Sequence, residues 1–466
     1  MFLTDLYQIK NRSKYEVLLK QLPQHILFSV TEKIQRTINP AMLFAAGYKD
    51  FYGKRFYWKD PQDDLIIVSF GHVQTLQATQ DDQDRFSYIE NEWNQIINTA
   101  MIKNDYLVSG TGPLILGGFS FDQSTVKQEW ESFANATFHI PQIMFTFTQG
   151  ELYLTINLMT GVNDIDTLLS VEEHIQKLLQ SIDAPQLSLP NIVQNNEIGA
   201  DHWKQAVQKT IDRIRNGEMD KVVLARKMKI EFDQPILSEQ VLYNLLKQQY
   251  ESYIFALEVG NQSFIGASPE RLIQKENEQI LSTCLAGSIK RSQNLVEDEK
   301  LGHTLLQDEK NQKEHHFVVS MIKQVLQPFC KELSIPDSPT LMKMRDIQHL
   351  YTPVRGEVKD KHETIFKLVK ALHPTPALGG IPRREAMATI RDVENMDRGF
   401  YGAPLGWVDY KGNGEFCVGI RSGLLKENEA YIYAGCGVVG DSNSDEEFKE
   451  TSVKFKPMLR ALGGNE

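Results

Sequence analysis

Residues 430–457, AYIYAGCGVVGDSNSDEEFKETSVKFKP, combine a strand, a turn lined by glycines, a polar loop and a helix. Because side chains alternate along a strand, Gly435 and Gly437 share one face of it. A glycine inside a strand costs stability and marks close approach by another backbone or by a ligand. The end of this strand is therefore a candidate binding surface, and it leads directly into a helix.

The helix that follows carries charged residues at spacings of three and four, which places Glu447, Glu450 and Lys454 on one face. Two carboxylates and an ammonium beside bare backbone can hold a magnesium ion and an anionic small molecule. The alternative is a capping box formed by Ser444 and Glu447, followed by a solvated helix face. From this stretch alone both interpretations stand.

The composition excludes several other classes of protein. With 41% apolar and 24% charged residues the chain is globular, and its net charge of -11 without any basic block argues against a nucleic-acid surface. No run of 18 apolar residues and no charged-then-apolar start is present, so neither a membrane span nor a signal peptide is predicted. The four cysteines lack paired or metal-type spacing, which is typical of reduced thiols in a cytoplasmic protein.

Several parts of the chain alternate side-chain character around short turns, as hairpins do. Residues 143–159 and 253–268 are predicted to be strand pairs, and residues 400–437 a three-stranded meander. Residues 184–200, with two prolines and polar neighbours, are predicted to be a linker. A long helix is predicted over residues 297–327, with a polar first half and an apolar second half.

The middle strand of the meander places an arginine between glycines. If side chains alternate through residues 416–423, Arg421 lies on the same face as Gly419 and Gly423. The missing side chains leave an open floor around the guanidinium, which suits a planar, bidentate clamp for a carboxylate. A solvated arginine would not need this floor, so the pattern favours a binding role.

Four further residues are candidates with an ordinary structural alternative. Lys221 opens a strand, where a solvated edge charge is the alternative. Glu270 lies where Pro269 ends a strand, and Glu314 lies where the polar and apolar faces of its helix meet. His349 is one of 11 histidines, and a single histidine near apolar residues is more often structural.

Well-known catalytic motifs are missing from the sequence. It contains no GxGxxG after a strand, no GxxxxGK[ST], no HExxH and no GxSxG. The candidate groups are carboxylates, lysines and arginines. They suit acid–base chemistry on an anion with a hard metal ion, rather than redox or serine chemistry.

Between residues 200 and 462 the sequence resembles the chorismate-utilising enzymes, the family that contains anthranilate synthase component I, aminodeoxychorismate synthase, isochorismate synthase and salicylate synthase. Residues 113–145 further resemble isochorismate synthases, whereas residues 1–110 match weakly. The order and spacing of many separate motifs make this resemblance specific. They are MDKVVLAR, GASPERL, CLAGS, LLQDEKNQKEHHFVV, QHL, HPTPALGG, GFYGAPLGW, IRSG, YAGCGVV and SDEEFKET.

The resemblance implies one large α+β domain in which antiparallel sheets pack face to face with helices outside. Chain length alone would suggest about three domains, and the family fold replaces that estimate. Within the single domain, residues 1–110 are expected to form a variable N-terminal part and residues 111–466 the chorismate-binding catalytic core.

The resemblance also implies the site. A magnesium ion is expected on Glu314 and Glu450, with the ring carboxylate of chorismate completing the site. The pyruvyl carboxylate is expected on Arg421 and Tyr401. Other residues expected to line the substrate pocket are Gly435, Gly437, Lys454, His349, Gly287, Ser288 and Ala377.

The identity of the nucleophile separates family members. Anthranilate and aminodeoxychorismate synthases carry glutamine where this chain has Lys221, and the latter carry a lysine where this chain has Ala286. Lys221 together with Ala286 is the pattern of isochorismate or salicylate synthases. Lys221 is expected to take a proton from the water that attacks ring C2, and Glu270 to protonate the departing C4 hydroxyl.

Salicylate synthases also eliminate pyruvate, and they tend to carry threonine near the position of Ala377. The alanine favours a dedicated isochorismate synthase, with salicylate synthase as the alternative. No glutaminase subunit is expected, since water rather than ammonia is the nucleophile. The long N-terminal region favours menaquinone over siderophore synthesis as the pathway.

Overall fold

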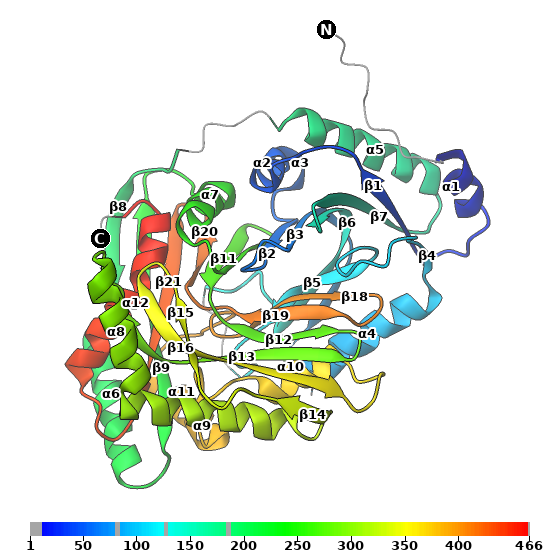
Figure 1. Ribbon diagram of the computed structural model, residues 1–466. Helices are drawn as coiled ribbons and strands as arrows, with labels where there is room; N and C mark the ends of the chain where they lie inside the picture. The colour runs from blue at the N-terminus through cyan, green and yellow to red at the C-terminus, as the bar shows by residue number, and fades with distance from the viewer. Residues whose placement is uncertain (1–11, 80–83, 125–128, 183–187, 465–466) are drawn as a thin grey trace.

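The computed structural model describes residues 12–79, 84–124, 129–182 and 188–464. Its strands form one continuous, strongly curved network, and all pairings are antiparallel except that of β1 (Leu27–Ile34) with β4 (Met101–Lys103). The network folds back on itself, so that two sheets face each other with helices on the outside (Figure 1). This confirms the predicted α+β fold.

Strand β6 (Ala136–Thr148) belongs to both sheets. One edge of β6 pairs along its whole length with β3, whereas its other edge pairs first with β5 and then with β7 (Glu151–Met159). The first sheet continues from β6 through β3 (Leu65–Ala78), β2 (Arg55–Lys59), β10 (Tyr253–Val259), β11 (Gln262–Ser268), β20 (Ser422–Lys426), β21 (Glu429–Val438), β9 (Lys221–Phe232) and β8 (Ile192–Glu197).

The second sheet continues from β6 in the other direction. Its strands are β5 (Leu114–Phe119), β18 (Pro404–Asp409), β19 (Gly414–Val418), β12 (Arg271–Glu276), β13 (Gln279–Lys290) and β16 (Ile347–Val358), followed by β14 (Cys330–Ser334) and β15 (Thr340–Lys343). The short strand β17 (Gly380–Ile381) pairs with the start of β9.

An aromatic core fills the space between the two sheets. Phe255 and Phe264 reach it from the first sheet, Leu405 and Trp407 from the second, and all four are buried. Trp130 lies among them with its ring 5.3 Å from that of Phe264. Burial of large aromatic surface from both sheets is what holds them face to face.

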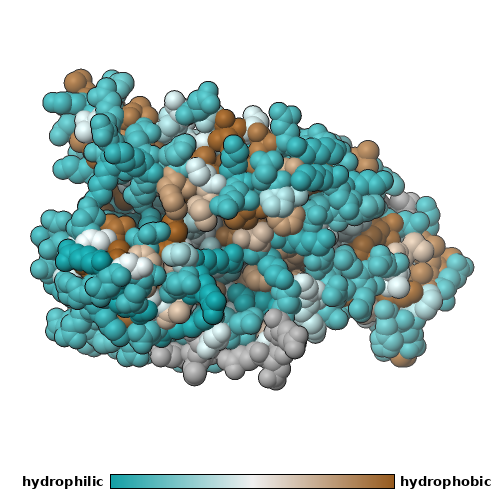
Figure 2. Space-filling model, turned by 90° about the horizontal axis from the view of Figure 1, so that it is seen from below, coloured by the Kyte–Doolittle hydropathy of each residue, from teal (hydrophilic) through white to brown (hydrophobic). Residues whose placement is uncertain are grey.

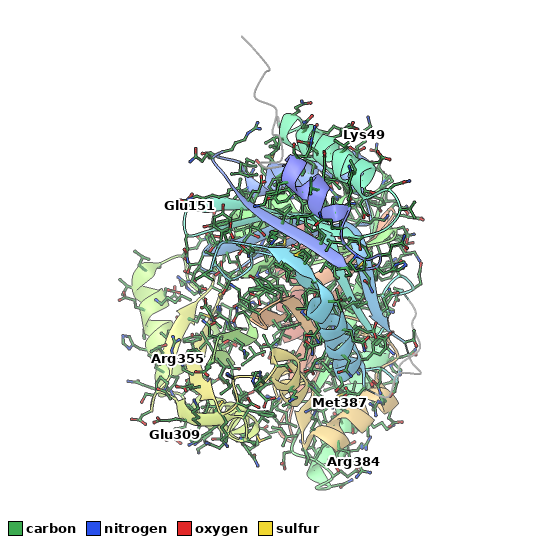
Figure 3. All side chains as sticks on the ribbon, turned by 90° about the vertical axis from the view of Figure 1, so that its right-hand side faces the viewer. Lys49, Glu151, Glu309, Arg355, Arg384 and Met387 are labelled. Carbon is green, nitrogen blue, oxygen red and sulfur yellow. The ribbon has the colours of Figure 1, made fainter. Side chains whose placement is uncertain are left out.

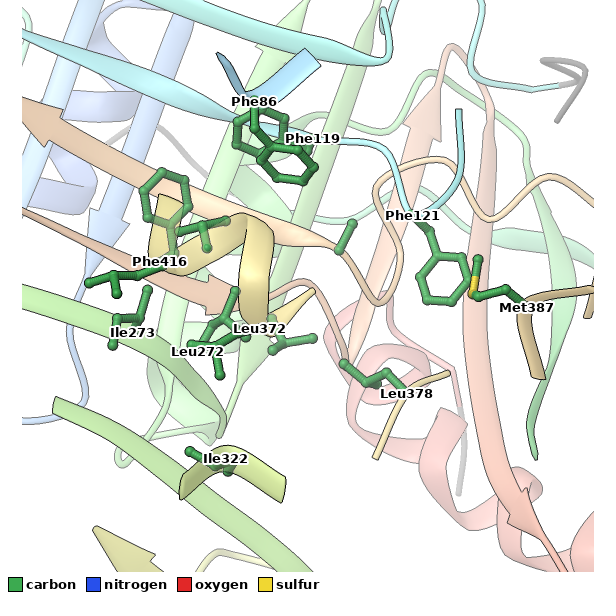
Figure 4. Close-up of a cluster of buried hydrophobic side chains, with 14 of the residues drawn as sticks. Phe86, Phe119, Phe121, Leu272, Ile273, Ile322, Leu372, Leu378, Met387 and Phe416 are labelled. Atoms are coloured by element: carbon green, nitrogen blue, oxygen red, sulfur yellow. The ribbon is translucent and has the colours of Figure 1, made fainter. Parts of the chain in front are cut away.

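Helices cover the two outer faces, each over its own apolar cluster. The first sheet is covered by α1 (Arg12–Leu19), α2 (Pro40–Ala46), α3 (Tyr48–Phe51), α5 (Asp164–Gln180), α7 (Ser238–Gln248) and α12 (Ser444–Ala461). The other cluster, drawn in Figure 4, packs under α4 (Arg85–Thr99), α6 (Ala200–Arg215), α9 (Glu309–Leu326), α10 (Ile365–Leu372) and α11 (Arg383–Val393). Among the described helices, none is both long and apolar enough to cross a membrane.

The predicted helix over residues 297–327 is wrong, because two helices occupy this stretch. Helix α8 (Leu295–Gln307) ends and α9 begins at Asp308, whose backbone is extended, with φ -73° and ψ 110°. The Asp308 side chain accepts a hydrogen bond from the backbone N–H of Asn311 at 2.7 Å. Aspartate at this position caps the second helix and so ends the first.

Two other predicted elements also differ. Part of the predicted linker is strand β8, which pairs along the edge of β9 from Ile192 to Glu197. The predicted meander has four strands, since the chain leaves the second sheet after β19 and enters the first at β20. Between β19 and β20 Arg421 has φ 50°, so side chains do not alternate through this segment. The prediction that Gly419, Arg421 and Gly423 share one face of a strand is therefore wrong.

The N-terminal residues contribute strands to the same network. Strand β2 pairs with β10, and β3 pairs with β6. The boundary at residue 110 stays a prediction.

Candidate active site

A cavity of about 400 Å³ opens between the ends of β9 and β21 on one side and β13 and β16 on the other, with α9 and α12 at its mouth. Every residue that the family resemblance implies for catalysis, substrate binding or metal binding lines it, whereas Glu447, the other carboxylate considered for magnesium, does not. The implied residues are Lys221, Glu270, Gly287, Ser288, Glu314, His349, Ala377, Tyr401, Arg421, Gly435, Gly437, Glu450 and Lys454. Residues more than two hundred positions apart are thus brought to one place, while their individual roles remain predictions.

Gly437 makes room for the side chain of Lys221. The two residues lie on neighbouring strands, because β9 and β21 pair with Gly437 opposite Val223. A Cβ atom on Gly437 would lie 2.7 Å from Cε of Lys221, closer than two carbons can approach. Lys221 passes over the bare backbone and places its Nζ 2.7 Å from Oε1 of Glu314.

Gly435 serves the neighbouring tyrosine and lysine. A Cβ atom there would lie 3.3 Å from the hydroxyl oxygen of Tyr401, and the Gly435 carbonyl accepts a hydrogen bond from Nζ of Lys454 at 2.9 Å. The Tyr401 ring stacks on Tyr433 with centroids 5.3 Å apart. Burial raises the pKa of Tyr401 to about 12, so its hydroxyl is a hydrogen-bond donor at neutral pH.

Helix α9 is held against the second sheet by the residue that follows Glu314. The buried His315 donates from Nδ1 to the carbonyl of Ala286 at 3.0 Å, and its Nε2 accepts from the hydroxyl of Thr352 at 2.7 Å. Burial lowers the pKa of His315, which agrees with a neutral ring in these two bonds. Glu314 is thereby fixed at the mouth of the cavity.

The second carboxylate at the mouth comes from α12. Glu450 lies 2.6 Å from Nζ of Lys454, one helical turn along, and half of its side chain is exposed. Carboxylate oxygens are the ligands that Mg²⁺ prefers, and two accessible carboxylates fit an ion that keeps further positions for substrate and water. In the described part of the chain no group of three or more acidic, histidine or cysteine residues converges as a metal site. The protein would therefore supply fewer ligands than the ion needs.

The loop before α12 corrects the predicted cap. The N-cap is Asn443, whose side chain accepts from the N–H groups of Asp445 and Glu446, so Ser444 and Glu447 do not form a capping box. Glu447 instead interacts with Ser442 and Cys436, and burial raises its pKa. It does not line the cavity.

Glu270 is buried at the join of β11 and β12. Burial raises its pKa to about 7, although the positive charge of Arg421 acts in the opposite direction. Pro269 and Glu270 interrupt the strand, as the sequence predicts, and turn the carboxyl group into the cavity. A carboxylic acid that keeps its proton near neutral pH can act as a general acid.

Arg421 lies where the chain crosses between the two sheets. Its left-handed backbone is held by the N–H of Ala267, which donates to the Arg421 carbonyl at 3.0 Å. Burial lowers the pKa of its guanidinium, and the nearby Tyr401 and Glu450 act against this. A desolvated guanidinium beside a tyrosine hydroxyl is suited to bind a carboxylate.

A β-bulge in β13 forms the wall opposite Arg421. The register with β16 shifts between Leu285 and Ser288, and Gly287 takes φ 79°. After the bulge Ser288 pairs with His349, and Ser288 Oγ lies 2.7 Å from His349 Nδ1. Burial and the charges of Arg421 and Lys454 lower the pKa of His349 to about 3, so the ring is neutral at physiological pH.

Some residues that shape the cavity carry no signal in the sequence. Arg398 donates to the carbonyl of Leu378 at 3.1 Å and to that of Val223 at 2.7 Å, and both of these residues line the cavity. Arg398 also forms a buried ion pair with Glu394. Asn311 lies three residues before Glu314, and this helical spacing is the one sign that could have indicated it.

Comparison with known proteins finds relatives that match most of the chain. The isochorismate synthase MenF of Bacillus subtilis is 40% identical over 96% of this chain and 95% of that protein. The salicylate biosynthesis isochorismate synthase of Pseudomonas aeruginosa is 36% identical over 92% of this chain and 89% of that protein.

A solved structure of the menaquinone-specific isochorismate synthase MenF from Escherichia coli covers 97% of this chain and 98% of its own. It is 23% identical with a TM-score of 0.79, which shows the same fold. The family model for chorismate-binding enzymes matches residues 11–463. Since this match spans nearly the whole chain, and the motifs of the site lie within it, the protein belongs to the chorismate-binding enzyme family.

Proposed function

We propose that this protein is an isochorismate synthase that uses Mg²⁺ to interconvert chorismate and isochorismate. The observation that carries the proposal is that Lys221 and Glu270, a candidate base and a candidate acid, line one cavity with Arg421 and two accessible carboxylates. Full-length similarity to proteins named isochorismate synthases supports it.

Chorismate is a dianion, and the cavity offers cations at separate places. Arg421 and the Tyr401 hydroxyl bind the pyruvyl carboxylate, while Lys454 lies on the side of α12. Glu314 and Glu450 would hold Mg²⁺ on the side of the ring carboxylate. When bound, the ion would neutralise this carboxylate and withdraw electron density from the ring.

The reaction exchanges one hydroxyl for another across the ring. Lys221 takes a proton from a water molecule while the oxygen of that water forms a bond to ring C2. The ring double bonds shift, and the bond between C4 and its hydroxyl group breaks. Glu270 gives the departing hydroxyl a proton, so that it leaves as water. The raised pKa of Glu270 supports this role, since a carboxyl with its usual pKa would have no proton to give at pH 7.

The enzyme acts without a glutaminase partner in this proposal. Lys221 stands where ammonia-using relatives carry glutamine, and the buried Ala286 stands where aminodeoxychorismate synthases carry a lysine. The small side chain of Ala377 leaves the reaction at isochorismate, without elimination of pyruvate.

The test is to incubate the purified protein with chorismate and Mg²⁺ and to separate the products by chromatography. Isochorismate is expected, and it should form from chorismate without glutamine or ammonia. Formation of anthranilate, or of salicylate together with pyruvate as the main product, would refute the assignment.

We also propose that the isochorismate serves menaquinone synthesis. The support is the name MenF of the Bacillus subtilis relative, which the menaquinone-specific enzyme of Escherichia coli also carries. Deletion of the gene should abolish menaquinone and leave catechol siderophores unchanged, as measured by mass spectrometry. Unchanged menaquinone in the deletion strain would assign the product to another pathway.

A further inference from the structure

A second cavity, of about 800 Å³, lies between α4, α10 and α11, away from the residues described above. Its apolar wall includes Phe86, Phe121, Phe366 and Met387. Figure 4 shows the side chains of Phe121 and Met387 next to each other, at the edge of the buried cluster. Seen from below, the surface of the molecule is mostly hydrophilic, with scattered apolar patches (Figure 2).

The polar part of this wall is positively charged, although the whole chain carries a net charge of -11. Five lysine and arginine side chains line the cavity, against three carboxylates. Two of the carboxylates already have their own cations: Asp84 lies 2.7 Å from Lys370, and Asp122 forms an ion pair with Arg391.

Arg85 is the buried cation of this cavity. Its side chain is only 7% exposed, and it donates to the side chain of Gln123 at 2.9 Å and to the carbonyl of Ser120 at 3.0 Å. Its Nε has no hydrogen-bond partner, and no carboxylate among the described residues forms an ion pair with it. A buried guanidinium without an ion pair is costly: burial lowers the pKa of Arg85 to about 10, against the attraction of Asp122 and Asp84, and an anionic ligand would reduce that cost.

A second arginine lies at the rim without a carboxylate. Arg383 donates to the carbonyls of Ala371 and Lys370 at the end of α10, and within the described residues it forms no ion pair. An aromatic wall beside two arginines that form no ion pair among the described residues is suited to a flat aromatic anion.

We propose that this cavity binds a small aromatic carboxylate and that its occupation alters substrate binding in the active site. The link is Arg398, whose guanidinium lies 4.1 Å from the ring centre of Phe121. The same arginine holds the carbonyls of Leu378 and Val223, which line the active-site cavity. Within the second cavity Phe121 is also held by His373, whose Nε2 donates to the Phe121 carbonyl at 3.0 Å.

Binding is tested by calorimetry with 2-naphthoate as the probe, on protein kept free of Mg²⁺ so that chorismate is not consumed. The probe is expected to bind also in the presence of saturating chorismate, with its affinity changed by the same factor by which it changes the affinity for chorismate, while neutral 2-naphthamide binds at least about tenfold more weakly. Arg383→Gln and Arg85→Gln should each weaken binding of 2-naphthoate at least about tenfold.

Arg384→Gln is the matched control, because Arg384 is the exposed neighbour on α11 and does not line the cavity (Figure 3). It should bind the probe as the wild type does. Displacement of the probe by chorismate, or unchanged binding by Arg383→Gln, overturns the site. Arg383 is exposed, so this variant does not depend on the folding of Arg85→Gln.

The link to the active site is tested by kinetics with Mg²⁺ present. Saturating 2-naphthoate should change the KM for chorismate at least about twofold in the wild type and in Arg384→Gln, and not in Arg383→Gln. Unchanged KM and kcat at saturating probe would overturn the link.

Discussion

The two residues proposed for proton transfer owe their properties to different surroundings. Lys221 is near the cavity mouth, 2.7 Å from Glu314, and lies over a glycine. Glu270 is buried at a strand end, and this burial raises its pKa to about 7, so that it keeps its proton near neutral pH. The proposed base, Lys221, and the proposed acid, Glu270, thus line the same cavity in different environments.

Replacement of Lys221 should abolish turnover without unfolding the protein. Lys221→Ala removes the proposed base, and kcat for isochorismate formation should fall about 100-fold or more. Lys229→Ala, on the same strand but bonded to Glu231 and Glu429 away from the cavity, is the control and should keep its activity. Near-normal kcat in Lys221→Ala would remove this residue from the acid–base role.

Glu270 should determine the alkaline side of the pH profile. With its pKa raised to about 7 in the free protein, the carboxyl holds its proton below that pH and loses it above, so wild-type kcat/KM should fall as pH rises through about 7. Glu270→Gln cannot donate, so kcat/KM should be low at every pH and this fall should disappear. If the variant keeps the same alkaline fall, another group supplies the proton.

At the scale of elements, two boundaries position the site. The change of sheet between β19 and β20 turns Arg421 into the cavity, and the break at Asp308 separates α8 from α9, which carries Glu314. Both depend on the local backbone: a left-handed residue in the first case and an aspartate cap in the second. Changes at such boundaries should affect function through position rather than chemistry.

Removal of the cap at Asp308 should affect both stability and Mg²⁺ binding. Asp308→Ala should cost about 1 kcal/mol of unfolding free energy, and it should raise the Mg²⁺ concentration for half-maximal activity because the start of α9 frays. Asn294→Ala removes the equivalent cap of α8, where Asn294 accepts from Val296 and Glu297. This control should lose similar stability in denaturant titrations and keep its Mg²⁺ dependence; an equal Mg²⁺ effect in both variants would disprove the positional role.

A single methyl group on β21 should displace the proposed base. In Gly437→Ala the new Cβ would lie 2.7 Å from Cε of Lys221, and the flexible lysine would move rather than the strand. Stability should change little, while kcat falls at least about tenfold. Gly150→Ala is the control, because no atom lies within 4 Å of a Cβ added at this turn. Its φ of 74° adds backbone strain, so this variant should lose some stability and keep its kcat. Full activity in Gly437→Ala would show that the path of Lys221 does not matter.

At the scale of the whole molecule, the cavity exists because one curved strand network faces itself. Lys221 and the 435–437 turn belong to the first sheet, whereas the bulge at Gly287 and His349 belong to the second. The two carboxylates at the mouth come from helices on different sheets, α9 and α12. Bringing them to one ion would connect the two sheets at the open end of the cavity.

Either carboxylate should therefore control the metal requirement. Glu314→Gln and Glu450→Gln should each raise the Mg²⁺ concentration for half-maximal activity at least about tenfold, as measured by titration at saturating chorismate. Glu309→Gln on α9, labelled in Figure 3, and Glu446→Gln on α12 are exposed controls that do not line the cavity. Unchanged dependence in the first two variants would place the metal ion elsewhere.

Local patterns predicted the elements whose signals are local. The hairpins of residues 143–159 and 253–268 form because turn residues and the alternation of side chains act over a few positions. The break at Asp308 and the strand β8 were missed. In the sequence, Asp308 cannot be distinguished from any other polar residue on a helix face. Strand β8 forms because it pairs with β9, and this neighbour is not evident from the local sequence.

By itself the sequence determined which residue types could do the chemistry, and its motifs indicated the family and a set of site residues. The tertiary structure decided the pKa values and positions of those residues, because burial and neighbouring groups act through space. It buried Glu270, which raises the pKa of the carboxyl group, and it placed the side chain of Lys221 over the backbone of Gly437. It also supplied Arg398, whose bonds to two backbone carbonyls no pattern in the chain could indicate.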